Sequence, residues 1–163
     1  MQIPKEISSA VNKGLYRLSM GDLTCAEMME YLVSKERKNT GFSEEIAEKT
    51  VAFLESEGFL DDKRYLKILL RRYDERKFGP RKIREELIRH RFSHRYVEAA
   101  MARRIDYTDR AFALLLREKQ TETINQSPKE RKKAVDFLVR RGYDYSTALS
   151  AVRRIDEDDT FSE

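Results

Sequence analysis

Three short stretches of the chain repeat at nearly equal intervals. Each is an aromatic residue followed by a helix-capping residue, and the steps between them are 50 and 51 residues: Phe42-Ser43, Phe92-Ser93 and Tyr143-Asp144. Ser and Asp are favoured N-cap residues, and an apolar residue just before the cap packs against the first turns of its helix. A repeat of this length predicts a series of similar helical units.

The residues after each pair repeat as well. Apolar side chains follow at helical spacing in all three places, as Ile46, Ala47, Thr50 and Val51, then Tyr96, Val97, Ala100 and Met101, then Thr147, Ala148, Ala151 and Val152. Upstream of each pair lies another helix start, at 24–27, 79–82 and 127–130, and the helical patterns at 64–71 and 110–117 align without a gap. No strand-like alternation bounded by turn residues occurs, so the sequence predicts an all-α fold.

The predicted architecture is three tandem three-helix repeats. They cover residues 1–60, 61–105 and 106–156, and the acidic segment 157–163 is expected to be a disordered tail that could compete for basic surface. The stretch "KERKNT" at 35–40 lengthens one joint of the first repeat. Charged residues make up 38% of the chain, so the apolar residues form narrow stripes, which favours an elongated array.

Several classes of protein are disfavoured by the residues present. His90 and His94 are four apart, as in helical zinc sites, but they fall at a helix end and a helix start among arginines, which argues against a metal site. Cys25 is the only cysteine, which excludes an internal disulfide and favours a small core residue in a reducing compartment. Neither a phosphate-binding glycine loop nor a catalytic motif is found. We expect no enzyme activity, no cofactor and no metal.

The location follows from hydropathy. No apolar run is long enough to cross a bilayer, and the first residues lack the apolar core of a signal peptide. The sequence therefore predicts a cytoplasmic protein with no membrane partner, and we expect a monomer.

Positive charge is concentrated in the middle of the chain. Residues 63–105 carry 15 Lys and Arg against 5 Asp and Glu, whereas acidic residues exceed basic ones in 1–62 (12 against 7) and in 106–163 (12 against 11). An excess of like charge repels itself in the folded state, so its presence indicates an anionic partner. The alternative is a solvated face stabilised by pairs such as Arg81 with Glu85 and Lys82 with Glu86.

The type of basic residue narrows the range of possible binding partners. Arginine dominates the middle segment and suits bidentate contacts to phosphate or carboxylate. Aromatic residues that could stack on bases are few, and Tyr65 and Phe92 are expected to be core residues. Contacts to a nucleic-acid backbone or to a protein are therefore favoured over reading of base sequence.

The assembled string "GFLDDKRYLKILLRRYDERKFGPRKIREELIRHRF" resembles the RecX family of bacterial regulatory proteins. The matching elements are residues 58–62, Arg64 with Tyr65, Arg71, residues 79–83 and Leu87, and the likeness extends from about residue 8 to 155. It implies an all-helical modular protein that binds the RecA recombinase filament and inhibits or modulates its ATPase, strand exchange and coprotease activities in recombination, DNA repair and the SOS response. Affinity for DNA is also implied.

Carried onto matching positions, the resemblance gives a set of candidate residues. Those expected to face the partner or DNA are Arg64, Arg71, Arg72, Arg76, Lys77, Arg81, Lys82 and Arg84. Those expected to shape and cap helices are Gly58, Asp61, Asp62, Gly79 and Pro80. One departure is Arg91, where family members often carry Gly, so this joint has to close without a left-handed glycine.

The competing interpretation is a general DNA- or RNA-binding helical module with no recombinase partner. The sequence leaves open whether inhibition works by capping filament ends, by blocking the groove or by disassembly.

Overall fold

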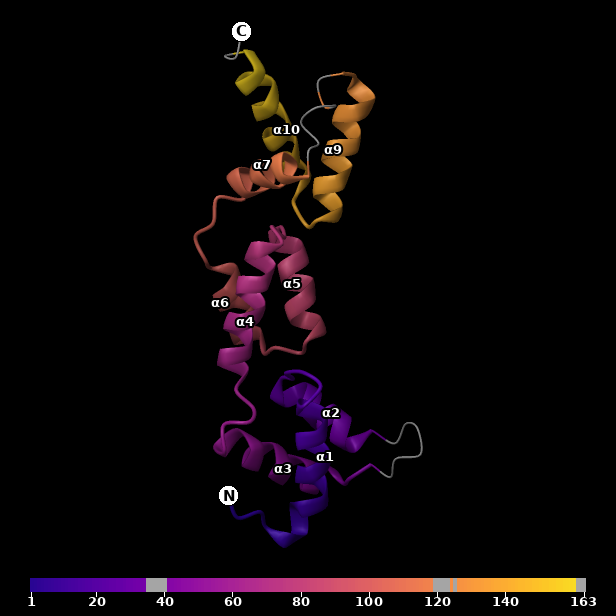
Figure 1. The fold of residues 1–163 in the computed structure, drawn as a ribbon, viewed down its shortest axis with the longest axis vertical. Coiled ribbons are helices and arrows are strands. Elements are labelled where there is room, and N and C mark those ends of the chain that lie inside the picture. The colour runs from indigo at the N-terminus through magenta and orange to yellow at the C-terminus, as the bar shows by residue number, and fades with distance from the viewer. Residues whose placement is uncertain (35–40, 119–123, 125, 161–163) are drawn as a thin grey trace. The chain divides into compact units, whose positions relative to one another are not determined.

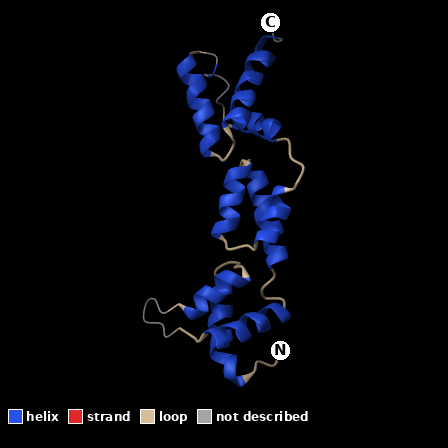
Figure 2. Cartoon of the chain, turned by 180° about the vertical axis from the view of Figure 1, so that it is seen from behind, coloured by secondary structure: helices blue, strands red, loops and turns tan. Residues whose placement is uncertain are grey.

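The computed structural model describes residues 1–34, 41–118, 124 and 126–160, the last five of these by backbone alone. In these ranges every regular element is helical (Figures 1 and 2), as predicted. The lengthened joint at 35–40 lies outside the described residues, and so do residues 161–163 of the predicted tail. Residues 157–160 of that tail are helical, where the sequence predicts disorder. Within the same ranges, no helix combines the length and the apolar character that a membrane crossing needs.

The helices follow one another in three groups. A short 3-10 helix, η1 (Lys5–Ile7), and α1 (Ser8–Leu18), α2 (Cys25–Val33) and α3 (Glu44–Ser56) come first. Next come α4 (Asp62–Glu75), α5 (Pro80–Arg89) and α6 (His94–Met101), and then α7 (Tyr107–Arg117), α9 (Pro128–Arg140) and α10 (Tyr145–Thr160). The third helices begin directly after Ser43, Ser93 and Asp144, where the sequence predicts them. The repeat boundaries themselves stay a prediction.

Helix starts are fixed by side-chain caps. Thr24 and Glu27 form a complete capping box at α2, Oγ of Ser43 accepts from the N–H of Ile46 at α3, and Oγ of Ser127 accepts from the N–H of Glu130 at α9. Pro128 follows directly at the first helical position, where its missing N–H costs no hydrogen bond. Such caps define where each helix begins.

Among the described residues, four helices end in the same way, by a Schellman motif. In this motif the chain turns through one left-handed residue and the next N–H bonds five residues back. The left-handed residues are Gly58 after α3, Lys77 after α4, Arg91 after α5 and Gly142 after α9. Arg91 thus adopts, at φ 55°, the conformation that glycine would take more readily. The joint that lacks a glycine closes with a left-handed arginine.

The chain forms two compact units that are not simple halves of the sequence. Unit 1 comprises residues 1–69 and 87–96, and unit 2 comprises residues 70–86 and 97–163. The core of unit 1 includes Met28, Leu32 and Leu54, which are fully buried, and the core of unit 2 includes Leu114, Leu138 and Tyr143. Tyr65 and Phe92 are buried in unit 1, as predicted.

Candidate partner-binding surface

The paired carboxylates at 61 and 62 stabilise the starts of two different helices. Oδ1 of Asp61 accepts from the backbone N–H of Arg64 at 2.8 Å, which caps α4. Oδ1 of Asp62 accepts from the backbone N–H of Cys25 at 2.8 Å, which is the first residue of α2. Because an anion at a helix N-terminus is stabilised by the free N–H groups, each carboxylate serves one helix, and Asp62 joins α4 to α2 within unit 1.

Arg64 is the candidate cation that lies in unit 1. Its side chain is exposed, and its Nη2 donates to the carbonyl oxygen of Gly58 at 3.2 Å. Arg91 lies in the same unit and is paired with Glu30, with 2.6 Å between Nε and Oε2. His90 hydrogen-bonds Glu27 through Nδ1 at 2.9 Å. Of these three side chains, that of Arg64 has no acidic partner among the described residues.

The other candidate cations lie in unit 2. Arg71 and Arg72 are exposed on the C-terminal half of α4, and Arg76, which directly follows its last residue, is exposed as well. Arg71 has one acidic neighbour, Glu75, at 3.7 Å, and both side chains are more than two-thirds exposed, so the pair is weak. Arg72 and Arg76 form no ion pair with another described residue. These two guanidinium groups are therefore available for an outside anion.

Lys77 occupies the left-handed position that ends α4. Its φ is 54°, its N–H donates to the carbonyl of Asp74 at 3.1 Å, and the N–H of Phe78 donates to the carbonyl of Tyr73 at 3.0 Å. The rings of Tyr73 and Phe78 stack at 5.5 Å, which is the apolar contact that accompanies this motif. The amine of Lys77 has no carboxylate partner in the described ranges. A lysine here carries conformational strain that a glycine would not.

The carbonyls at the end of α4 are satisfied by side chains from further along the chain. The oxygens of residues 75–78 accept from Nη1 of Arg117 at 2.8 Å, Nη2 of Arg141 at 2.7 Å, Oη of Tyr143 at 2.6 Å and Nη1 of Arg110 at 3.1 Å, in that order. Cations at a helix C-terminus oppose its negative dipole end. Burial raises the pKa of Tyr143, which keeps its hydroxyl a donor.

Arg81 and Lys82 contribute to the packing of unit 2. The turn before α5 meets the turn after α9, where the N–H of Gly79 donates to the carbonyl of Arg141 at 2.9 Å and the N–H of Arg81 donates to that of Gly142 at 3.0 Å. The Nη2 of Arg81 donates to the carbonyl of Val139 at 2.7 Å. Lys82 is half-buried beside Gly142 and pairs with Glu86 at 3.0 Å. Both cations are thus partly engaged by unit 2 itself.

Acidic side chains compensate further cations. Nη1 of Arg84 lies 2.8 Å from Oε1 of Glu98. Asp74 accepts two hydrogen bonds from Arg103, at 2.9 and 3.1 Å, and one from Arg110 at 2.8 Å. Burial alone would raise the pKa of Asp74, but the hydrogen bonds from these two guanidinium groups outweigh it and the pKa is lowered. Asp74 is therefore a charged structural group of unit 2.

The candidate cations thus differ in whether the protein itself supplies them with a partner. Arg72, Arg76 and Lys77 form a basic cluster at the end of α4 that has no acidic partner among the residues described, and we call it the α4 cluster. Arg81, Lys82 and Arg84 have internal partners. Sequence reasoning missed Arg103, Arg110, Arg117 and Arg141, because their ligands are backbone carbonyls or one distant carboxylate, which leave no local pattern. Only the alignment of residues 64–71 with 110–117 gave a hint that Arg110 and Arg117 had equivalent places.

Solved structures share the fold of this chain. A RecX crystal structure from Lactobacillus salivarius is similar to this chain with a TM-score of 0.75, over 94% of this chain and 99% of that one, at 19% identity. A second, described as a crystal structure of regulatory protein RecX, has a TM-score of 0.66 over 87% of this chain and 69% of that one, at 20% identity. The chain therefore has the fold of these two proteins. No protein-family model matches the chain.

Curated relatives define the family. The regulatory protein RecX of Stenotrophomonas maltophilia (strain R551-3) is 31% identical over 142 residues, 86% of each chain. That of Vibrio parahaemolyticus serotype O3:K6 is 32% identical over 152 residues, 92% of this chain and 94% of the relative. That of Xanthomonas campestris pv. campestris (strain B100) is 32% identical over 136 residues, 83% of each. The chain belongs to the RecX family of regulatory proteins.

Proposed function

We propose that this protein acts in the cytoplasm as a regulator of the RecA recombinase, binding the nucleoprotein filament and inhibiting or modulating its ATPase, strand exchange and coprotease activities. Family membership supports the regulatory role, and the resemblance to RecX implies the partner. The observation that carries the proposal is the α4 cluster, whose three cations form no ion pair with another described residue. Like charges in such a cluster repel one another, and an anionic surface that binds them relieves this repulsion. Binding is therefore favourable in free energy.

The contact is polyvalent and electrostatic. Arginines bind phosphate and carboxylate through paired N–H donors, so the α4 cluster can contact either the DNA backbone or acidic groups of the recombinase. Arg64 and Arg71, both exposed on α4, extend the set of cations that can take part. Because such contacts release counterions, binding weakens steeply as salt rises.

The experiment is a charge reversal of the two least compensated arginines. An Arg72→Glu, Arg76→Glu variant is titrated against RecA filaments, and inhibition of ATPase is compared with that of the unchanged protein. The matched control is Lys129→Glu, Arg140→Glu, which reverses two exposed cations of α9 that also lack an ion pair with another described residue. We expect the concentration for half-inhibition to rise at least about tenfold in the first variant. The control should inhibit at the same concentration as the unchanged protein.

Equal loss in both variants would show that overall charge alone drives binding and would count against the α4 cluster. A chase with competitor DNA separates the general nucleic-acid-binding alternative from a recombinase regulator. If inhibition persists at fixed DNA when competitor is added, the filament is the target. If competitor removes all inhibition, DNA is the whole target and the recombinase proposal is wrong.

A further inference from the structure

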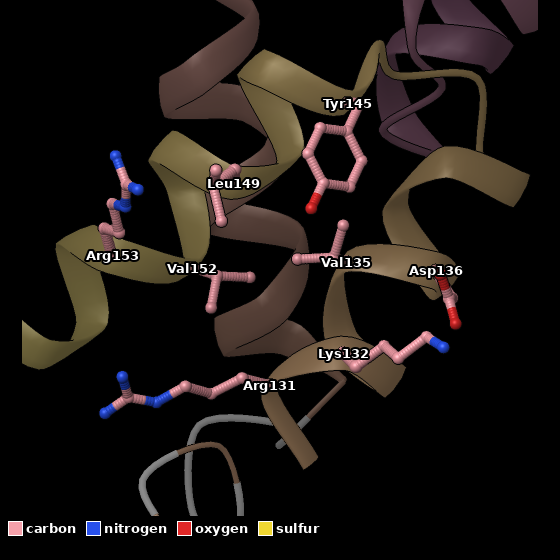
Figure 3. Close-up of a pocket in the computed structure, with 8 residues that line it drawn as sticks. All are labelled: Arg131, Lys132, Val135, Asp136, Tyr145, Leu149, Val152 and Arg153. Carbon is pink, nitrogen blue, oxygen red and sulfur yellow. The ribbon is translucent and has the colours of Figure 1, made fainter. Parts of the chain in front are cut away.

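A pocket of about 480 Å³ lies between α9 and α10, within unit 2 (Figure 3). Its floor is aliphatic and consists of Val135 from α9 with Leu149 and Val152 from α10. Val135 and Val152 belong to the core of unit 2, whereas Leu149 is half-buried and packs against it. A cavity of this size holds one or two apolar side chains of a ligand.

Basic side chains border the aliphatic floor. Lys132 lies on the α9 side and Arg153 on the α10 side, and both are exposed. Neither makes an ion pair with another described residue. Asp136 is the acidic side chain of the lining. The rim therefore favours an anion, and the floor favours an apolar group beside it.

Tyr145 forms one wall of the pocket. It is 65% exposed, which is unusual for an aromatic side chain, and Figure 3 shows its hydroxyl directed towards Val135. A tyrosine placed in this way combines apolar contact with a hydrogen-bonding end and loses little conformational freedom on binding. Exposed aromatic and basic residues around an aliphatic hollow are typical of peptide-binding grooves.

A nucleic acid fits this pocket less well. Single strands are held by several aromatic platforms with cations along the backbone, and Tyr145 is the aromatic residue among those lining the pocket. The aliphatic floor offers a base no stacking partner and no hydrogen bond. A protein segment can fill it with Leu, Ile or Phe while its carboxylates meet the rim.

We propose that the α9–α10 pocket is a docking site for an acidic peptide segment that inserts an apolar side chain between Val135, Leu149 and Val152. Lys132 and Arg153 bind its carboxylates, and Tyr145 covers the inserted side chain. The inference is independent of the recombinase proposed above, since it rests on the chemistry of the pocket and assigns a protein contact that does not involve the α4 cluster.

The test uses the full chain and a labelled synthetic peptide with Leu at every third or fourth position and Glu elsewhere, followed by fluorescence anisotropy. We expect saturable binding that is lost when the leucines of the probe become serines. Binding is expected to weaken about tenfold in a Lys132→Glu, Arg153→Glu variant and to weaken also in Tyr145→Ser. Thermal unfolding of each variant checks that unit 2 remains folded.

The matched control is Lys133→Glu. Lys133 is next to Lys132 on α9 and exposed, but it lies outside the pocket lining. It should bind the probe as the unchanged protein does. Four outcomes would overturn the proposal: no binding, equal binding of the serine probe, equal loss in Lys133→Glu, or displacement of the peptide by oligothymidylate with the same variant pattern. The last of these would make the pocket a nucleic-acid surface.

Discussion

At the scale of single residues, two kinds of residue in the described part of the chain adopt left-handed backbone, glycine and a long basic residue. Gly58 and Gly142 take it without strain, whereas Lys77 and Arg91 take it at φ 54° and 55°. A non-glycine residue in this region costs roughly 1–2 kcal/mol relative to right-handed backbone. Arg91 gains an ion pair with Glu30 in return. Lys77 has no such compensation among the described residues.

Lys77→Gly separates stability from binding. The substitution removes the strain and keeps the carbonyl that accepts from Tyr143, so we expect the free energy of unfolding to rise by about 1 kcal/mol. If Lys77 contacts the filament, inhibition weakens in the same variant. Urea unfolding and filament ATPase measure the two effects.

Arg91→Gly is the control, because it relieves the same strain but loses the pair with Glu30. An exposed ion pair contributes about 0–1 kcal/mol. Arg91→Gly should therefore gain less stability than Lys77→Gly. A Lys77→Gly variant less stable than the unchanged protein would contradict this account.

Gly142→Ala tests the close approach of two turns. A Cβ at Gly142 would lie 2.3 Å from Cβ of Lys82 and 2.4 Å from its backbone nitrogen. Since the backbone cannot move aside easily, we expect a loss of about 2–5 kcal/mol from strain and overpacking together. Thermal or urea unfolding measures it.

Gly58→Ala is the matched comparison, because Gly58 is left-handed at φ 78° but has no atom within 4 Å of the added methyl position. It should lose only the conformational part, about 1 kcal/mol. Equal losses at both positions would show that crowding at Gly142 is unimportant.

At the scale of helices, caps were the feature that the sequence predicted best. Capping residues act within three positions of the helix start, so Thr24, Ser43 and Ser127 could be read directly from spacing. The partner of Asp62 could not, because its carboxylate accepts from Cys25, 37 positions earlier. The same limit applies to Arg110, Arg117 and Arg141, which bind carbonyls at the end of α4. Local chemistry leaves a pattern in sequence, whereas contacts made by tertiary folding do not.

Asp62 also contributes to the pKa of the Cys25 thiol. Burial, and then the carboxylates of Asp62 and Glu55, raise the pKa of the Cys25 thiol to about 12. Only the thiolate reacts with alkylating reagents, so the native thiol should be inert near neutral pH. We expect Asp62→Ala to lower this pKa and to speed alkylation, and to cost about 1 kcal/mol by removing a helix cap. The pH dependence of alkylation by iodoacetamide measures the first effect.

Asp61→Ala provides the control, since it removes the cap of α4 at a similar cost in stability but is not among the groups that raise the pKa of Cys25. Equal acceleration in both variants would point to general loosening of unit 1 and would argue against a specific effect of Asp62.

At the scale of the whole molecule, stability should depend on acid pH through unit 2. The pKa of Asp74 is lowered by Arg103 and Arg110 against the effect of burial, and that of Asp144 is lowered first by the Ser146 hydroxyl and then by the N–H of Thr147. A carboxyl whose folded pKa lies below its unfolded value stabilises the fold above the unfolded pKa of about 4. That stability is lost as pH falls through the folded pKa.

We therefore expect the melting temperature to fall as pH is lowered from about 5 to about 2. Asp74→Asn should be destabilised at neutral pH, because Arg110 is nearly buried and loses its carboxylate. The variant should also lose less stability on acidification than the unchanged protein. Parallel melting curves against pH for the two proteins would contradict a role for Asp74.

The predictable part of the molecule is the order and type of its helices. Which basic residues are paired within the fold and which are not was less predictable. Composition gives the number of charges but does not show which of them the fold neutralises. Arg84 looked free in sequence, but Glu98 lies fourteen positions away and 2.8 Å distant. The α4 cluster differs from Arg84 in having no such pair with another described residue.

The meeting of the two turns offers a spectroscopic reporter. Amide protons in the first turn of a helix have no acceptor within that helix and normally exchange rapidly with water. The N–H of Arg81, in the first turn of α5, donates to the carbonyl of Gly142, and the N–H of Gly79, just before the helix, donates to that of Arg141. Both should therefore exchange slowly in the free protein. A ligand that loosens the end of α9 from the start of α5 should therefore speed deuterium uptake at these two amides, without any substitution in the chain.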